Sequence, residues 1–326
     1  LCVDDELIVN AKGYAWIEKE YSDEGKTVLE TFMDAEGNPD LKIAIADADG
    51  VIVARYPDPS TSTFTAHSAL SSSHTGASST ATSSIQFTDL PTGVYTVYAV
   101  ANTAGLWGMN GSFENCTTQA QLQALLFKET TPTVASDGCM PLSATGPLSV
   151  NASRSGLVYL ELLRCVGKVG LSFKNETGEE LTLTNCSVSI GKINPKQGWL
   201  FAASPDRVSG IGTSWADNQD LTFPTVTLSL SEGATEQVGS PALVFPSVAP
   251  EQSEGSRYLC SVSFTLNGES YSFLNMPVHD NRSQDIPALG RNQYLQIVTR
   301  INSGHEISFN FEVQSWTAKT EEVFFH

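Results

Sequence analysis

Residues 157–173 read LVYLELLRCVGKVGLSF, and this stretch decides the fold class. Apolar side chains recur at every second position of its second half, and Cys165 shares their parity. A period of two is typical of β-strands, because successive side chains of a strand point to opposite faces. We therefore predict two strands, 157–163 and 166–173, with Cys165 as a buried cysteine that forms no disulfide.

The same period recurs along most of the chain, interrupted by turn residues at short intervals. Many short strands separated by turns are typical of all-β sandwiches. We predict an all-β fold of two sandwich domains in tandem, with residues 1–6 as a tether, 7–153 as the first domain and 154–326 as the second. The other strands that we expect are 7–21, a hairpin in 41–56, 84–87, 94–102, 181–190, 221–230, 242–245, 258–266, 270–274, 294–301 and 306–313.

Asp49-Gly50 lies between the two β-branched runs of residues 41–56. An Asp-Gly pair between such runs is the strongest short-range signal for a hairpin. Asp47 and Asp49 also resemble the start of a calcium loop, but the third oxygen ligand and the distal Glu of that loop are absent. The pattern therefore favours a hairpin over a metal site.

One short helix is expected in the N-terminal domain. Thr117 or Thr118 can cap it, because a threonine hydroxyl accepts a hydrogen bond from the backbone of the first helical turn. Leu122, Leu125 and Leu126 would then lie on one face of the helix.

The charge of the chain excludes one class of partner. The 326 residues include 18 Lys and Arg against 36 Asp and Glu, so the formal net charge is −18. Nucleic-acid phosphates repel such a chain, and it has no basic stripe to offset the repulsion. We therefore expect no nucleic acid among its partners.

The sequence lacks the usual patterns of catalysis and metal binding. It has no C-x-x-C pair for zinc and no G-x-S-x-G nucleophile elbow. His279 and Asp280 are adjacent, but neighbours in a strand point to opposite faces and cannot share a proton. We predict no enzymatic activity, no cofactor and no metal site.

Two tryptophans leave a second hypothesis open, a surface module that binds glycans. Trp107 and Trp215 lie in loop-like contexts, where an exposed ring can stack on a sugar. The alternative is that each ring closes the end of a sandwich.

The N-terminal residues suggest a lipid anchor. Cys2 followed by an acidic segment is what remains of a bacterial lipoprotein after its signal peptide is cleaved, and the thiol then carries the lipid. The alternative is an ordinary cysteine in a frayed terminus.

Several segments together resemble one family, the fimbrillins of the Bacteroidales. The first is an apolar run that ends in Arg164 and is followed by Val166, Gly167, Lys168 and a second apolar strand. The others resemble the Arg-Asn-x-x-Tyr strand and the Pro-Trp ending of that family, and comprise Arg291, Asn292, Tyr294 and Trp316.

This resemblance implies two transthyretin-like, Greek-key sandwiches in an outer-membrane lipoprotein that assembles into a fimbria on the cell surface. Its partners would be other fimbrial subunits, joined by donation of a β-strand, together with host or bacterial surface receptors or glycans. Asp4, Asp5 and Glu6 resemble the acidic export signal that follows the lipidated cysteine in surface lipoproteins of these bacteria.

The chain departs from the stalk subunits of that family, in which cleavage after an arginine removes the first strand. Residues 22–40, between the expected first and second strands, contain Lys26 but no arginine, and the first arginine of the chain is Arg55. We therefore favour an accessory, tip or anchor subunit over a stalk subunit.

The C-terminal tail has two interpretations of equal weight. Val323, Phe324 and Phe325 are apolar and β-prone enough to form a donor strand for a neighbouring subunit. They can equally form a last edge strand of their own domain.

Overall fold

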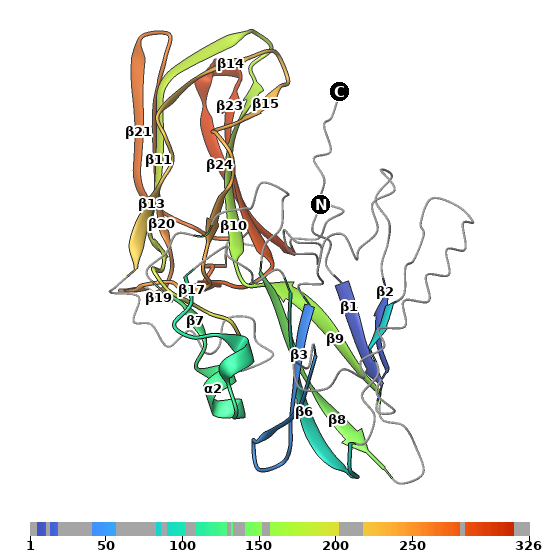
Figure 1. Ribbon diagram of the computed structural model, residues 1–326. Helices are drawn as coiled ribbons and strands as arrows, with labels where there is room; N and C mark the ends of the chain where they lie inside the picture. The colour runs from blue at the N-terminus through green and yellow to red at the C-terminus, as the bar shows by residue number, and fades with distance from the viewer. Residues whose placement is uncertain are drawn as a thin grey trace, which may run out of the picture.

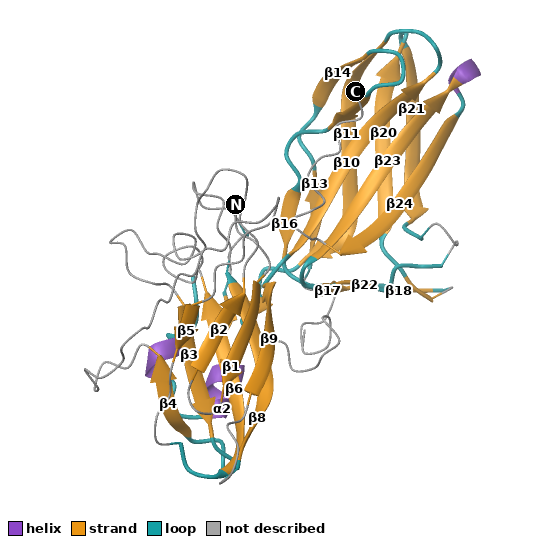
Figure 2. Ribbon diagram, turned by 90° about the vertical axis from the view of Figure 1, so that its right-hand side faces the viewer, coloured by secondary structure: helices purple, strands orange, loops and turns teal. Residues whose placement is uncertain are grey.

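The computed structural model is built almost wholly of β-strands, arranged as two β-sandwiches that follow one another along the chain (Figures 1 and 2). The predicted all-β fold of tandem sandwiches is therefore confirmed. The structure describes residues 5–10, 14–18, 41–56, 83–85, 90–101, 108–128, 132, 141–151, 157–201, 218–253, 255–280 and 284–315.

One antiparallel sheet of eight strands forms the N-terminal sandwich, in the order β4-β3-β6-β8-β9-β1-β2-β5. Where described, β8 and β9 pair at two positions, Leu142 with Arg164 and Ser143 with Leu163, and the sheet divides there into two halves. Leu160 of β9 lies in the same core as the buried residues of the first half, so the halves pack face to face. The strands are β1 (Asp5–Asn10), β2 (Tyr14–Glu18), β3 (Leu41–Ala46), β4 (Ile52–Tyr56), β5 (Ser83–Ile85), β6 (Gly93–Ala101), β8 (Leu142–Val150) and β9 (Leu157–Arg164).

β3 is buried on both of its faces. Ile43 and Ile45 point into the core between the two halves of the sheet. Ala44 and Ala46 point the other way, into a second core that lies against the short helix of this sandwich. This double burial explains why residues 43–46 form a continuous apolar run rather than an alternating one.

The predicted helix is present but shorter than expected. Thr118 caps it, because its hydroxyl accepts a hydrogen bond from the backbone N–H of Gln121, and the side chain of Gln121 accepts one from Thr118 in return. Leu122 and Leu125 are buried. Leu126 lies in a following strand, so the prediction that all three leucines share one helical face is wrong. The elements of this layer are η1 (Phe113–Asn115), α2 (Gln119–Gln123) and β7 (Leu126–Phe127).

The hairpin predicted around Asp49-Gly50 is confirmed by the antiparallel pairing of β3 with β4. A carboxylate oxygen of Asp47 accepts hydrogen bonds from the backbone N–H groups of Asp49, at 3.0 Å, and Val51, at 2.9 Å. Gly50 has a φ of +78°, which glycine adopts without steric cost. Asp47 therefore orders the turn.

The first predicted strand is in fact a hairpin. We expected one strand over 7–21, whereas β1 and β2 are separate antiparallel strands with Leu7 opposite Ile17. β1 begins at Asp5, within the segment that we expected to be a tether.

The C-terminal sandwich consists of two facing five-stranded sheets. One has the order β15-β10-β23-β24 with β16 also on β10, and the other has the order β13-β11-β20-β21 with β14 also on β11. β10 and β23 are parallel neighbours. The elements are β10 (Gly167–Glu176), β11 (Leu181–Asn194), β12 (Gly198–Trp199), β13 (Gln219–Thr222), β14 (Val226–Leu230), β15 (Thr235–Gln237), β16 (Ala242–Val244), β17 (Ser247–Val248), β18 (Glu251–Gln252), β19 (Gly255–Ser256), β20 (Leu259–Leu266), β21 (Glu269–Pro277), β22 (Ala288–Leu289), β23 (Gln293–Asn302), η3 (Ser303–His305) and β24 (Ile307–Ser315).

The chain passes from the first sandwich to the second at Cys165 and Val166, between β9 and β10 (Figure 1). β9 pairs with β1 and β8, so it belongs to the N-terminal sheet although it follows residue 153. The predicted domain boundary between residues 153 and 154 stays a prediction.

Two cysteines lie in the core of the C-terminal sandwich. Cys186 on β11 and Cys260 on β20 are fully buried and free. Burial raises the pKa of the Cys186 thiol to about 11 and that of Cys260 to about 12, from an ordinary value of 9.0. Both thiols therefore stay neutral in the folded protein at pH values where an unfolded chain ionises them.

Replacing Cys260 with Ala should weaken the dependence of stability on alkaline pH. Between the unfolded pKa and the folded pKa the unfolded chain binds fewer protons than the folded one, so stability falls as the pH rises through that window. One thiol contributes at most about 1.4 kcal/mol per pH unit to this slope. Denaturant unfolding at about pH 8, 9 and 10.5 measures it.

Val262→Ala is the matched control, because Val262 is buried on the same strand and carries no proton. Both variants should lose stability at all pH values. Only Cys260→Ala should show the shallower slope, and equal slopes would contradict the burial argument.

Candidate functional site

The two motifs that the sequence singles out meet at the joint between the sandwiches. Arg291 and Arg164 lie 127 residues apart in sequence. Even so, Nε of the Arg291 guanidinium donates a hydrogen bond to the Arg164 carbonyl oxygen at 3.1 Å. The parallel pairing of β10 with β23 brings the motifs together, with Lys168 opposite Tyr294. The site is therefore assembled by the topology of the second sandwich.

Arg291 is the centre of this joint, and only 5% of its surface is exposed. Its Nη2 donates to the carbonyl oxygen of Leu163 at 2.8 Å and to the hydroxyl of Ser143 at 2.7 Å. Longer contacts reach the Cys165 sulfur, at 3.2 Å, and the carbonyl of Leu200, at 3.4 Å. A buried guanidinium is tolerated only where such acceptors replace water, so the joint solvates this charge with its own backbone.

Arg164 and Asn292 form the second polar contact of the joint. Nη1 of Arg164 donates to the side-chain oxygen of Asn292 at 2.6 Å, and both residues are buried. The backbone N–H of Asn292 donates to the carbonyl of Val166 at 2.9 Å. Asn292 has a φ of +53°, a left-handed conformation that asparagine adopts more readily than most residues. Asn292 therefore accepts the hydrogen bond from Arg164 and also forms the turn that leads into β23.

Tyr294 and Lys168 close one side of the joint. The Lys168 ammonium lies 4.6 Å from the centre of the Tyr294 ring, within the range of a cation–π contact. Burial raises the pKa of Tyr294. A Cβ on Gly170 would lie 2.2 Å from the Tyr294 hydroxyl oxygen, so a larger residue there would displace the Tyr294 ring.

An apolar layer joins the two sandwiches beside the polar contacts. β7 of the N-terminal sandwich pairs with β12 of the C-terminal one, with Phe127 opposite Gly198. The ring of Phe127 stacks on that of Phe245, with 5.8 Å between centres and 8° between planes. The sequence gives no local signal for Gly198 and Phe245, because their contact depends on segments far apart in the chain.

Cys165 is buried and forms no disulfide, as predicted. Burial raises the pKa of its thiol, although the positive charge of Arg291 acts in the opposite direction. A neutral, inaccessible thiol is a poor nucleophile, so Cys165 serves packing rather than chemistry.

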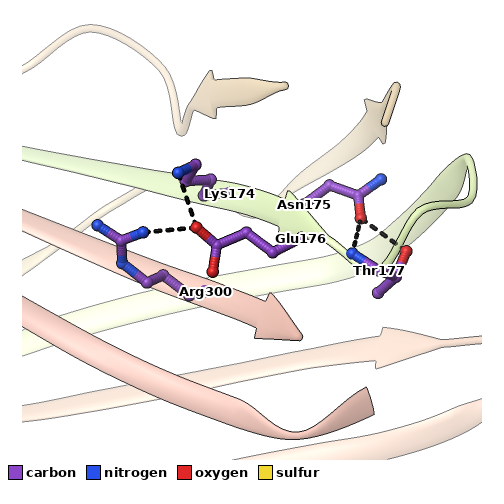
Figure 3. A network of polar contacts seen from close by, with 5 residues as sticks. All are labelled: Lys174, Asn175, Glu176, Thr177 and Arg300. Carbon is purple, nitrogen blue, oxygen red and sulfur yellow. Dashed lines mark hydrogen bonds and ion pairs between the residues drawn. The ribbon is translucent and has the colours of Figure 1, made fainter. Parts of the chain in front are cut away.

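A second polar network lies at the far end of β10 (Figure 3). Glu176 accepts from Lys174 at 2.7 Å and from Arg300 at 2.6 Å, and the hydrogen bond from Lys174 is the main cause of its lowered pKa. Asn175 is fully buried, and its side-chain oxygen accepts from the backbone and the hydroxyl of Thr177. These groups satisfy one another and order the turn after β10.

The first strand occupies an interior place in the N-terminal sheet. β1 pairs with β9 at six positions, from Asp5 with Leu162 to Asn10 with Leu157, and with β2 on its other side. Asp5 and Glu6 of the predicted export signal are thus strand residues.

Other predicted residues have different outcomes. The His279 ring nitrogen Nδ1 lies 3.0 Å from the backbone carbonyl oxygen of Asp280. In the described part of the chain no three His, Cys, Asp or Glu side chains gather as a metal site, and no helix is long and apolar enough to cross a membrane. Some of the predicted site residues lie outside the described ranges, namely Cys2, Asp4, Trp107, Trp215, Trp316, Val323, Phe324 and Phe325.

The sequence matches no protein-family profile and no curated protein. Among solved structures, a candidate cell adhesion protein from Parabacteroides distasonis matches with a TM-score of 0.53 and 11% identity, over 98% of this chain and 99% of that one. A candidate cell adhesion protein from Bacteroides eggerthii has a TM-score of 0.48 and 14% identity, over 85% and 88%. A fimbrilin from Porphyromonas gingivalis has 0.44 and 9%, over 85% and 90%. The Parabacteroides protein therefore shares the fold over nearly the whole chain.

Replacing Gly198 with Ala should loosen the joint. The new Cβ would lie 2.2 Å from the Phe245 ring, which must leave its stack on Phe127. Such overpacking costs about 1–3 kcal/mol, measurable as a lower free energy of unfolding in denaturant.

Gly191→Ala on β11 is the matched control. Its Cβ would meet nothing closer than the Leu259 carbonyl oxygen, at 3.7 Å. If Gly198→Ala and Gly191→Ala were equally stable, the packing of Phe245 against Gly198 would not be what holds this layer.

Proposed function

We propose that this chain is a structural and adhesive subunit of a bacterial cell-surface fimbria, with no enzymatic role. The fold that it shares with a candidate cell adhesion protein supports the proposal. Its partners are other fimbrial subunits, which it joins by donation of a β-strand, and surface receptors or glycans that it adheres to. A lipid on Cys2 holds it at the outer membrane.

The position of β1 is the observation that carries this proposal. Because β1 lies between β9 and β2, its removal would leave the backbone groups of β9 unpaired along the length that β1 covers. An extended segment from another chain binds such an edge by β-augmentation. The place of β1 is therefore the acceptor site in our proposal, and β1 itself occupies it in this chain.

The position of Arg55 supports an accessory, tip or anchor subunit rather than a stalk subunit. Arg55 lies in β4, and its Nη1 donates to the carbonyl of Phe113 at 3.2 Å. A cut after Arg55 would separate β1 to β4 from the rest of the chain, including β3, whose Ile43 and Ile45 are fully buried. Such a cut removes part of the core rather than opening one groove.

An arginine-specific protease should leave the folded chain uncut after Arg55. The guanidinium of Arg55 is engaged, and a paired strand does not enter a protease active site as an extended segment without local unfolding. Intact mass measurement after native digestion checks this. A folded product that begins at Tyr56 would contradict it.

Lys26→Arg provides the matched comparison, since it places an arginine between β2 and β3 as in a stalk subunit. The protease should trim this variant after residue 26 and so release β1 and β2. Trimmed chains should then self-associate in size-exclusion chromatography, whereas the untrimmed chain should not.

Native protein taken from the cell surface should carry an acyl mass on Cys2 and retain β1. Mass spectrometry reports both in one spectrum. The variant Cys2→Ser should lose membrane association while its isolated fold is unchanged. Unmodified Cys2 in membrane-bound protein would rule out this anchor but not the fimbrial role.

A further inference from the structure

We infer that Arg291 is the residue through which the second sandwich fixes β9, the strand that carries β1. Arg291 lies two residues before the start of β23 and therefore belongs to the second sandwich. Its three shortest hydrogen bonds go to the carbonyls of the last two residues of β9 and to the hydroxyl of Ser143 on β8. The contact thus crosses from one sandwich to the other at a single buried side chain.

β9 depends on this contact because its other support is unevenly distributed. It pairs with β1 at six positions but with β8, where described, at two, Leu142 with Arg164 and Ser143 with Leu163. Arg291 bonds to the carbonyls of Leu163 and Arg164 and to Ser143, so it lies on the point where β8 and β9 meet. Leu160 adds an apolar contact in the first core.

Neighbouring contacts fix the same end of β9. The backbone N–H of Cys165 donates to the Pro141 carbonyl at 2.9 Å, which ties the end of β9 to the start of β8. The Arg164 side chain reaches Asn292 at 2.6 Å. The end of β9 is therefore clamped from both sandwiches, while the rest of its length is paired mainly with β1.

This clamp sets the register of β9 for any strand that occupies the place of β1. The register of an antiparallel pair decides which side chains face the core, and a slip by one residue would reverse all of them. Arg291 is thus a positioning residue for strand pairing. Its relevance to assembly rests on the proposed function, whereas its effect on β9 does not.

Hydrogen exchange on the full chain tests the inference, with Arg291→Met compared with Arg300→Met. Arg300 lies within β23, and its bond to Glu176 is near the far, exposed end of that strand (Figure 3). In Arg291→Met, amides of β9 and β1 should exchange at least about tenfold faster, because local opening of β9 no longer has to break the hydrogen bonds of Arg291. Amides of β11 and β20 should keep their rates. Arg300→Met should leave β9 unchanged.

Two milder variants keep the test decisive if Arg291→Met does not fold. Arg291→Lys keeps the charge without the planar fork, and Ser143→Ala removes one acceptor. Each should accelerate exchange in β9 by a smaller factor. Unchanged exchange in β9, or equal acceleration in all strands, would overturn the inference.

The result is separate from the test of the proposed function. The exchange pattern is measured on a single chain and does not require a fimbria. A chain that shows the β9 effect but never joins other subunits would support the inference about Arg291 and contradict the fimbrial role. A chain that joins other subunits but shows no β9 effect would support the fimbrial role and contradict the inference.

Discussion

The buried positive charge of Arg291 is the constraint on which the joint between the sandwiches depends. A guanidinium removed from water must find acceptors in the protein, and here they are the carbonyls of Leu163 and Arg164 and the hydroxyl of Ser143. These groups can meet Arg291 only when β8, β9 and the start of β23 are all in place. The charge therefore makes the relative position of the two sandwiches specific, and the stacked rings of Phe127 and Phe245 add an apolar contact.

The parts of the fold that depend on neighbouring residues could be predicted from the sequence, and those that depend on distant ones could not. Alternation in residues 157–173 predicted both strands and the burial of Cys165, because the period of a strand is a local property. It could not show that β9 joins the first sheet and β10 the second, since that choice depends on pairing with β1 and β23. The helix was predicted too long because Leu126 is drawn into pairing with β12.

The candidate site shows the same division. The resemblance singled out Arg164, Arg291, Asn292 and Tyr294, and the structure brings them together. Their role as a joint follows only from burial and hydrogen bonding, because the same residue types on a surface would suggest a binding site. Arg291, Arg164 and Asn292 all form hydrogen bonds within the molecule, and burial raises the pKa of the Cys165 thiol beside them. The geometry therefore supports a mechanical role for the motif.

The parallel pairing of β10 with β23 also has a consequence for the order in which the molecule forms. β10 is the first strand of the second sandwich and β23 is nearly its last, so this pair cannot form until almost the whole chain is available. Pairing between distant segments slows folding, because a long loop must close before any contact is gained. Arg291 reaches its acceptors only after that closure. The end of β9, at the middle of the chain, is therefore fixed only after the start of β23, which is synthesised much later, has reached it.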